Sequence, residues 1–504
     1  MADQYPILIL VSPFLLSFAV AIGGYFNKRV CWPITVAALA FSLFCGLQIA
    51  LRVAALNGAP LVYELGNWPA PVGIVYSIDA LNALVLVVIP LVGLLAAFYA
   101  RRSVEKELSD KLPLYYTLYL LLITGLTGMT LTGDAFNLYV LLEITALTGY
   151  ALIAVGKGRA ALSTFNYIIM GTIGASFYLL GVGYLYIKTG SLNMADIRRI
   201  LVEQGLYGSE TVMIAFIMIM VGLWVKMALF PLHGWLPNAY THAPNASSVV
   251  IAPLVTKVTV YIMIRMMMSV FSPAYAFQNL DWSRAVVWLA IIAILAGSVY
   301  ALSQRDLKRL LTYLIVAEVG YMVGGVWLAN RMGLTGAIFH IASDALMTLC
   351  LFLAVAIILY QTGHFELTSV RGLYKKMPFT MAGFTVGALS MIGIPPTCGF
   401  FSKWYLISGG IQAGQWGYVV ALLLSSLVNA VVFFRIIEFA HFGTEADLAA
   451  AGHHGHSGNP GIREAPLSMV IPLLIVGVLI LLLGIYSGRV VEFIGLFVNR
   501  LGLS

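Results

Sequence analysis

Charge is scarce in this sequence of 504 residues, and the shortage excludes a water-soluble fold. Only 10% of the residues are Asp, Glu, Lys or Arg, against about 25% in soluble globular domains. Hydrophobic residues make up 61% of the chain, and the mean hydropathy is +0.94. A surface this apolar needs lipid as its solvent. We therefore expect an integral membrane protein.

Cysteine is also rare, and the motifs of redox chemistry are missing. Cys31, Cys45, Cys350 and Cys398 form no Cys-x-x-Cys pair and lie in apolar stretches, which argues against a disulfide framework and against an iron–sulfur site. The sequence has no Rossmann glycine pattern and no facing pair of histidines that would suit haem. We expect this chain to bind no cofactor and no metal, and to contain no redox or hydrolytic centre. Membership of a redox enzyme complex stays open.

Basic residues are in excess but form no dense cluster. The chain has 28 Lys and Arg against 21 Asp and Glu, a formal net charge of +7. They are scattered over short loops, which is typical of the positive-inside bias of membrane proteins. The expected partner is therefore the lipid bilayer, with no nucleic acid.

Fourteen stretches are long and apolar enough to cross a bilayer, which takes roughly 20 mainly apolar residues each. They lie near 5–25, 32–55, 78–100, 114–132, 135–156, 164–188, 211–232, 246–271, 285–303, 309–329, 333–361, 378–408, 415–442 and 466–488. The segment 194–204 is expected to be a short amphipathic helix at the membrane interface. The sequence predicts an all-α polytopic membrane protein with about 14 transmembrane helices.

The distribution of basic residues predicts an orientation. Loops after odd-numbered spans contain fifteen Lys and Arg, and loops after even-numbered spans, with the tail, contain nine. Because basic loops stay in the cytoplasm, we expect a multi-pass protein of a bacterial inner membrane with both termini outside.

Charged residues inside spans are few, and they recur at a nearly constant interval. Spans 5, 7 and 8 contain Glu143, Lys226 and Lys257, and spans 10, 12 and 13 contain Glu318, Lys403 and Arg435. The three offsets are 175, 177 and 178 residues. Charges at mid-span cost a few kcal/mol each and persist mainly where they serve transport.

The two series lie five spans apart, and an odd number predicts that the second copy enters the membrane from the opposite side. Such inverted repeats are common in secondary transporters. The sequence predicts an N-terminal three-helix segment (1–112), a first repeat of spans 4–8 (113–271), a second, inverted repeat of spans 9–13 (284–442), and a cytoplasmic loop with a C-terminal helix (443–504).

Proline interrupts both spans that contain the lysines of this series. Pro231 follows Lys226 by five residues, and Pro395 and Pro396 precede Lys403. Proline removes a backbone donor and clashes with the preceding turn, so we expect helices 7 and 12 to be discontinuous. Broken helices are tolerated in membranes where protein or a hydrated cavity surrounds them.

These residues suit a proton relay. Desolvation weakens the hold of a lysine on its proton, and a nearby carboxylate restores it, so a Glu–Lys pair can act as a switch. We expect Glu143 to tune Lys226, and Lys257 to pass the charge inward. The alternative is a set of static ion pairs that only fix helix packing.

Span 11 adds a polar face to the second half. His340, Asp344 and Thr348 lie at i, i+4 and i+8 and therefore share one side of a helix. We expect His340 to link to Lys403, with Glu318 as a possible tuner.

Four stretches resemble a known family. They are GDAFNLYVLLEITALTGYAL (133–152), VKMALFPLHGWLPNAYTHAPNASSVVIAPLVTKVTVY (225–261), LSQRDLKRLLTYLIVAEVGY (302–321) and GIPPTCGFFSKWYLI (393–407). The chain resembles the antiporter-like subunits shared by respiratory complex I, membrane-bound hydrogenases and Mrp-type cation/proton antiporters, and within them the D subunit of the Mrp type.

This resemblance implies fourteen spans, two inverted five-helix half-channels and a central hydrophilic axis. It also implies other membrane subunits as partners. Its relay positions correspond to Glu143, Lys226, Lys257, His340 and Lys403 of this chain.

The chain departs from the family pattern in the second half. Where many members have a His-Ala-Leu-x-Lys run, this chain has Asp344 and Thr348 in place of the histidine and the lysine. Glu318 stands where glutamine is more common. These changes bear on the second half-channel and on the identity of the coupled ion.

Three functions follow as expectations. The first is proton transport in exchange for a monovalent cation, Na+, within an Mrp-type complex. The second is a proton-pumping subunit of a complex I-like oxidoreductase or a membrane-bound hydrogenase. A structural anchor with a defunct channel is a third.

The loop with His453, His454 and His456 is interpreted as a polar linker, with a metal site as its alternative.

Overall fold

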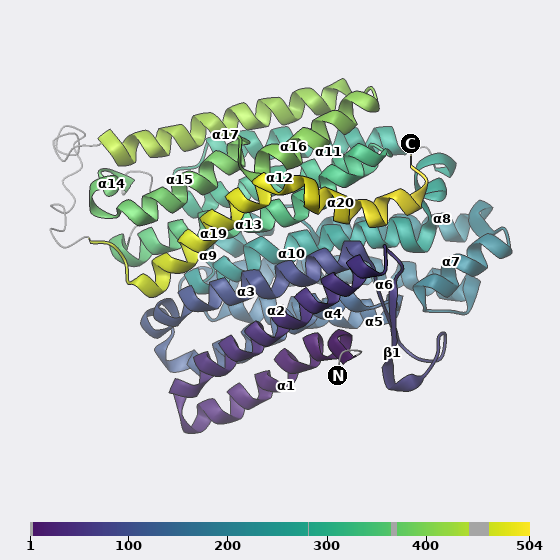
Figure 1. Ribbon diagram of the computed structural model, residues 1–504, viewed down its shortest axis with the longest axis horizontal. Helices are drawn as coiled ribbons and strands as arrows, with labels where there is room; N and C mark the ends of the chain where they lie inside the picture. The colour runs from purple at the N-terminus through teal and green to yellow at the C-terminus, as the bar shows by residue number, and fades with distance from the viewer. Residues whose placement is uncertain (1–3, 281, 364–369, 443–462, 504) are drawn as a thin grey trace.

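The computed structural model describes residues 4–280, 282–363, 370–442 and 463–503. Helices dominate it and run roughly parallel to one another (Figure 1). The earlier helices are α1 (Tyr5–Phe26), α2 (Cys31–Ala55), α3 (Ala80–Glu107), α4 (Leu112–Leu131), α5 (Ala135–Ala154), α6 (Ala160–Thr189), α7 (Met194–Glu203), α8 (Glu210–Lys226), α9 (Leu236–His242) and α10 (Asn245–Arg265). The later helices are α11 (Ser283–Leu302), α12 (Leu307–Trp327), α13 (Arg331–Thr362), α14 (Leu373–Lys376), α15 (Pro378–Ile392), α16 (Cys398–Gln412), α17 (Trp416–Phe442), α19 (Leu467–Ile485) and α20 (Ser487–Val498).

The predicted membrane spans are confirmed. Among the described residues, twelve helices are long and apolar enough to cross a membrane. They coincide with twelve of the predicted spans, and the other two, 211–232 and 378–408, each contain a break between shorter helices. The protein is therefore an all-α polytopic membrane protein with about 14 spans, of which the seventh and twelfth are discontinuous.

The first break follows Lys226, the last residue of α8. Ala228 adopts a left-handed φ of 61°, and Pro231 has no N–H to continue a helical hydrogen-bond ladder. The indole of Trp235 donates a hydrogen bond of 3.0 Å to the carbonyl of Val225. This bond satisfies one of the carbonyls left without a partner where α8 ends.

The second break precedes the lysine. Helix α15 ends at Ile392, and Gly393 follows in a left-handed conformation (φ 95°) that favours glycine. A Cβ atom at Gly393 would lie 3.3 Å from Cδ of Lys403. The chain re-enters a helix at Cys398, so Lys403 lies in the second turn of α16.

Three helices occupy the centre of the molecule. The apolar windows of α10 and α13 are 100% buried and that of α12 is 94% buried, whereas α17 is 39% and α1 is 28% buried. Charged side chains in the middle of α10, α12 and α13 are therefore enclosed by protein, and those on α17 can reach the outside.

The short helix expected at 194–204 is present as α7. Met194, Ile197 and Leu201 are its buried residues, at the i, i+3, i+7 spacing of an amphipathic helix. At the same end of the molecule a two-stranded antiparallel hairpin, β1 (Leu61–Glu64) and β2 (Val75–Ile78), extends away from the helices (Figure 1). This hairpin and α20 were not predicted.

Helix α19 joins distant parts of the chain. It packs against α3 of the N-terminal segment and against α13 and α15 of the second half. The division into four segments and the inversion between the two halves stay predictions.

Candidate functional site

Glu143 and Lys226 lie opposite each other on α5 and α8. Lys226 Nζ is 3.6 Å from Glu143 Oε1, longer than an N–H···O hydrogen bond. The Lys226 side chain is 8% exposed and that of Glu143 is 29% exposed. The two groups are therefore close without a direct hydrogen bond, and the Glu143 side chain is partly exposed on the outer surface of this single chain.

Lys257 and Asp344 form a tighter pair between α10 and α13. Lys257 Nζ lies 3.0 Å from Asp344 Oδ2, and both side chains are buried. Lys257 also donates to Thr348 Oγ1 and to the carbonyl of Ala252, each at 3.3 Å. The Thr348 hydroxyl donates to Asp344 Oδ1 at 2.7 Å. These contacts join the two halves of the chain, and sequence reasoning did not predict the Lys257–Asp344 pair.

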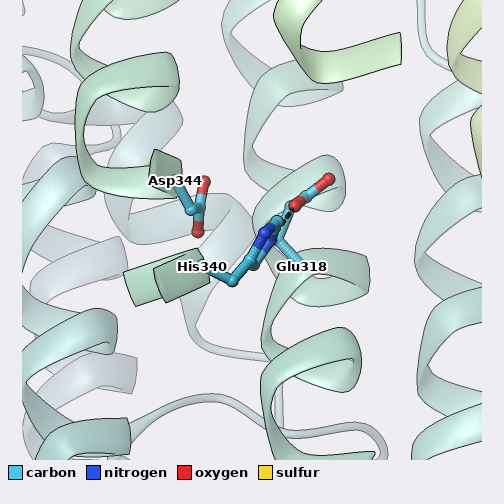
Figure 2. A group of neighbouring side chains, drawn as sticks. All are labelled: Glu318, His340 and Asp344. Carbon is cyan, nitrogen blue, oxygen red and sulfur yellow. Dashed lines mark hydrogen bonds and ion pairs between the residues drawn. The ribbon is translucent and has the colours of Figure 1, made fainter. Parts of the chain in front are cut away.

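His340 is enclosed one turn away from Asp344. Its Nε2 lies 2.5 Å from Oε2 of Glu318 on α12, and its Nδ1 lies 2.9 Å from Ser402 Oγ on α16. Figure 2 shows the imidazole directed toward Glu318, with Asp344 on the neighbouring turn of α13. His340 thus connects three helices through its two ring nitrogens.

Lys403 makes its direct contacts with neutral groups. Its ammonium donates to the carbonyl of Met391 at 2.7 Å and to Ser426 Oγ at 3.2 Å. It also lies 5.1 Å from the ring centroid of Tyr321, which is a cation–π distance. Within the described residues, no hydrogen bond or ion pair joins Lys403 to His340. The histidine contacts Ser402, the residue before the lysine.

These residues fall into groups in contact, between α5 and α8, between α10 and α13 and between α12 and α13, with Lys403 on α16, and together we call them the buried charge row. Its members are Glu143, Lys226, Lys257, Asp344, His340, Glu318 and Lys403.

Arg435 does not belong to the buried charge row, although its spacing made it the counterpart of Lys257. It is exposed on α17, with its guanidinium 5.6 Å from the ring centroid of Phe439. Helix α17 lies at the edge of the bundle, where a long arginine side chain can extend away from apolar surroundings. The recurrence of three charges therefore corresponds to two positions in the buried charge row, not three.

Sequence reasoning missed two enclosed cations. Arg265, at the end of α10, makes a two-pronged pair with Asp79, with N···O distances of 2.7 and 2.8 Å. Lys308, in the first turn of α12, is 3% exposed. Both lie near helix ends, so a search restricted to the middle of spans passes over them.

One cluster has the composition of a cation site. Single ligand atoms of Glu318, His340 and Asp344 lie within 4.8 Å of one another. Lys257 and Thr348 already contact Asp344, and His340 contacts Glu318. A cation here would compete with these protein groups. The histidine-rich segment at 453–456 lies outside the described residues.

Residues 132–428 match the model of the family described as NADH:quinone oxidoreductase/Mrp antiporter, TM. The N subunit of a NADH-quinone oxidoreductase from Desulforudis audaxviator is 41% identical over 497 residues, covering 98% of each chain. The D subunit of a Na(+)/H(+) antiporter from Bacillus subtilis is 31% identical over 396 residues, covering 78% of this chain and 79% of the relative.

A solved structure shares the whole architecture. It is a chain of the membrane-bound sulfane sulfur reductase, an archaeal respiratory membrane complex, with a TM-score of 0.88, 28% identity, and coverage of 99% of this chain and 98% of that chain. Residues 132–428, which match the family model, include every member of the buried charge row. The chain belongs to the NADH:quinone oxidoreductase/Mrp antiporter transmembrane family.

Proposed function

We propose that the chain translocates protons along the buried charge row as one subunit of a larger membrane complex. The observation that carries this proposal is the Lys257–Asp344 pair, whose 3.0 Å contact links the two halves at the centre of the bundle. Ionised groups are costly in a membrane interior and are retained mainly for function.

The row contains both partners that a charge switch needs. A lysine beside a carboxylate holds its proton, and the same lysine releases it more readily once the carboxylate moves away. The 3.6 Å pair of Glu143 and Lys226 can separate without breaking a direct hydrogen bond. Movement of this pair would change the field at Lys257.

In the second half, a proton can pass between side chains that already touch. Glu318 and Ser402 contact opposite nitrogens of His340, and imidazole can accept a proton on one nitrogen while releasing one from the other. Ser402 then leads to Lys403 on the same helix. Water would complete the steps for which the side chains are not in contact.

The inverted arrangement of the halves belongs to this proposal. Each half has a broken span with a buried lysine, although Lys226 precedes its break and Lys403 follows the other one. The orientation with the basic loops in the cytoplasm is also part of the proposal and would place both ends of the chain outside. Its support in Figure 1 is that the start of α1 and the end of α20 lie toward the same end of the bundle.

A multi-subunit setting is supported by the partly exposed Glu143. The exposed residues on either side of it on α5, Val140 at 40% and Leu147 at 61%, are apolar. A carboxylate on such a face is costly against lipid, so a neighbouring membrane subunit is the expected cover. The matched relatives are named as subunits of larger complexes.

Two driving forces for proton translocation are candidates. Exchange for Na+ in an Mrp-type complex is supported by the relative named as the D subunit of a Na(+)/H(+) antiporter. Redox-driven pumping is supported by the 41% identity to the relative named as the N subunit of a NADH-quinone oxidoreductase, which extends over nearly the whole chain.

Proton movement into everted membrane vesicles tests the proposal. Lys226→Ala and Glu143→Ala should each lower proton flux at least tenfold at normal assembly of the complex, because each removes one member of the switching pair. Flux in response to added Na+ would favour exchange, and flux in response to an electron donor would favour redox pumping. Undiminished flux in both variants would refute proton transfer along the row.

A further inference from the structure

Lys308 is an enclosed ammonium outside the buried charge row. Its Nζ donates to the carbonyl of Ala243 at 2.6 Å and to Asn245 Oδ1 at 3.4 Å. Among the described residues, no carboxylate lies within ion-pair distance of it. A buried lysine with only neutral partners is costly, so its presence calls for a reason.

Asn245, which accepts a hydrogen bond from Lys308, also holds the carboxylate of Glu107. The side-chain amide of Asn245 donates to Glu107 Oε1 at 2.9 Å, and its backbone N–H donates to Oε2 at 3.3 Å. Glu107 is half-buried and is the last residue of α3. Asn245 thus lies between the half-buried carboxylate of Glu107 and the enclosed ammonium of Lys308.

On its inner side, Lys308 borders a dry, narrow gap between α10 and α13. Asn245, Ser248 and Val249 line it from α10, and Phe352, Val355, Ala356 and Leu359 line it from α13. The gap has no space for a water molecule. Phe352 lies one turn beyond Thr348, which contacts Lys257 and Asp344. The lining of the gap extends along α13 from Phe352 to Leu359, so an apolar layer about two turns thick separates Lys308 from the buried charge row.

We propose that Lys308 is the outer proton-exchange residue of a gated route between α10 and α13, with Glu107 as its contact with bulk water and Phe352 as its apolar gate. This inference rests on the proposed function, because the route supplies the buried charge row. The structure represents the closed state, in which Asn245 and the apolar layer interrupt the route.

The transfers balance as simple proton movements. The Glu107 carboxyl releases a proton from its O–H bond, and the neutral amine of Lys308 forms an N–H bond with it. The resulting ammonium then donates a proton through water that enters when Phe352 moves, and the neutral amine of Lys257 receives it. No oxidant or other reactant is needed, and the same steps run in reverse for proton exit.

A conservative substitution separates this role from a structural one. If Lys308 only caps the end of α9 at Ala243, then Lys308→Arg should preserve function, because arginine keeps the charge and the donors. Arginine does not release its proton in proteins, so our proposal predicts at least a tenfold loss of proton flux in vesicles that contain the intact complex. Lys106→Arg is the matched control, because Lys106 at the same end also donates to a carbonyl, that of Tyr360 at 2.7 Å.

The gate has its own measurement, which stays informative if Lys308→Arg fails to assemble. Phe352→Ala should raise the passive decay of an imposed pH gradient severalfold, while Phe352→Leu should leave the decay unchanged. Normal flux in Lys308→Arg, or an unchanged decay in Phe352→Ala, would overturn the inference. Lys226→Ala measured in parallel distinguishes failure of the gated route from failure of the proposed function. If Lys226→Ala loses proton flux while Lys308→Arg keeps normal flux, only the gated route is refuted.

Discussion

Lys257 and Lys226 show how differently one side chain can be held in the same membrane interior. Lys257 has three oxygen partners, on Asp344, Thr348 and Ala252, which match the three donors of an ammonium group. Lys226 has a single acceptor at 3.6 Å. The first lysine is saturated and fixes two helices together, whereas the second is free to change partners.

A residue-scale prediction concerns the saturated pair. Asp344→Leu should lower the free energy of unfolding of the purified complex by about 3–5 kcal/mol, because it leaves the Lys257 ammonium buried without its counter-ion. Thermal unfolding in detergent would measure the loss. Arg489→Leu is the control, because Arg489 pairs with Glu492 at an exposed position, where ion pairs contribute about 0–1 kcal/mol. Equal losses in both would contradict the account.

His340 gives a second prediction at this scale. His340→Gln should lower proton flux at least tenfold, because an amide can hydrogen-bond to Glu318 and Ser402 but cannot accept and release protons near neutral pH. His441→Gln, at an exposed position near the end of α17, should leave the flux unchanged. Full flux in His340→Gln would assign the histidine a packing role.

At the scale of elements, the breaks in the two discontinuous spans place the lysines. Proline content alone predicted that both spans would be interrupted, because the missing N–H and the ring clash are local effects. The side of each break on which its lysine lies also followed from the sequence, because Pro231 comes after Lys226 and Pro395 and Pro396 come before Lys403. The left-handed conformations of Ala228 and Gly393 could not be predicted.

Gly393 tests the second break. Gly393→Ala should cost about 1–2 kcal/mol for the left-handed conformation, and its Cβ atom, 3.3 Å from Cδ of Lys403, should also displace that lysine and lower proton flux. Gly414→Ala is the matched control, with a φ of 65° and open space around the added atom. Both variants should lose stability in an unfolding assay, but only the first should lose flux. Equal flux in the two would contradict the proposed role of the break.

Some site residues could be predicted from the sequence and others could not, because burial depends on where each helix lies in the bundle. Spacing along the chain identified Glu143, Lys226, Lys257, Glu318 and Lys403 as charges inside spans, and all five lie in the row. The same spacing failed for Arg435, because sequence period does not reveal which helices lie at the edge of a bundle. The partner of Asp344 was equally hidden, since helix-to-helix contacts are set by tertiary packing.

For the whole molecule, hydropathy predicted the class, the number of spans and the short amphipathic helix, because lipid imposes a simple length and composition on each span. The hairpin β1–β2 was missed, since it is short and lies between two strong apolar runs. The orientation in the membrane rests on the asymmetry of basic residues alone.

Thiol labelling tests this orientation. The four native cysteines are buried, so a single cysteine introduced on the surface can be labelled against a low background. Gln204 directly follows α7, on the side expected to face outward. In intact cells, Gln204→Cys should react with a membrane-impermeant maleimide, while Arg102→Cys should react only after the membrane is opened. Both positions are exposed. The reverse pattern would invert the proposed orientation.

The most direct measurement of the central claim is proton flux through Lys257→Met/Asp344→Leu. Replacing a buried ion pair with apolar residues of similar size is often neutral or stabilising, so the double variant should assemble and unfold like the unmodified protein. If the buried charge row conducts protons, flux per assembled complex should fall at least tenfold. Flux at the unmodified level would mean that these charges only hold helices together, and the account would be wrong.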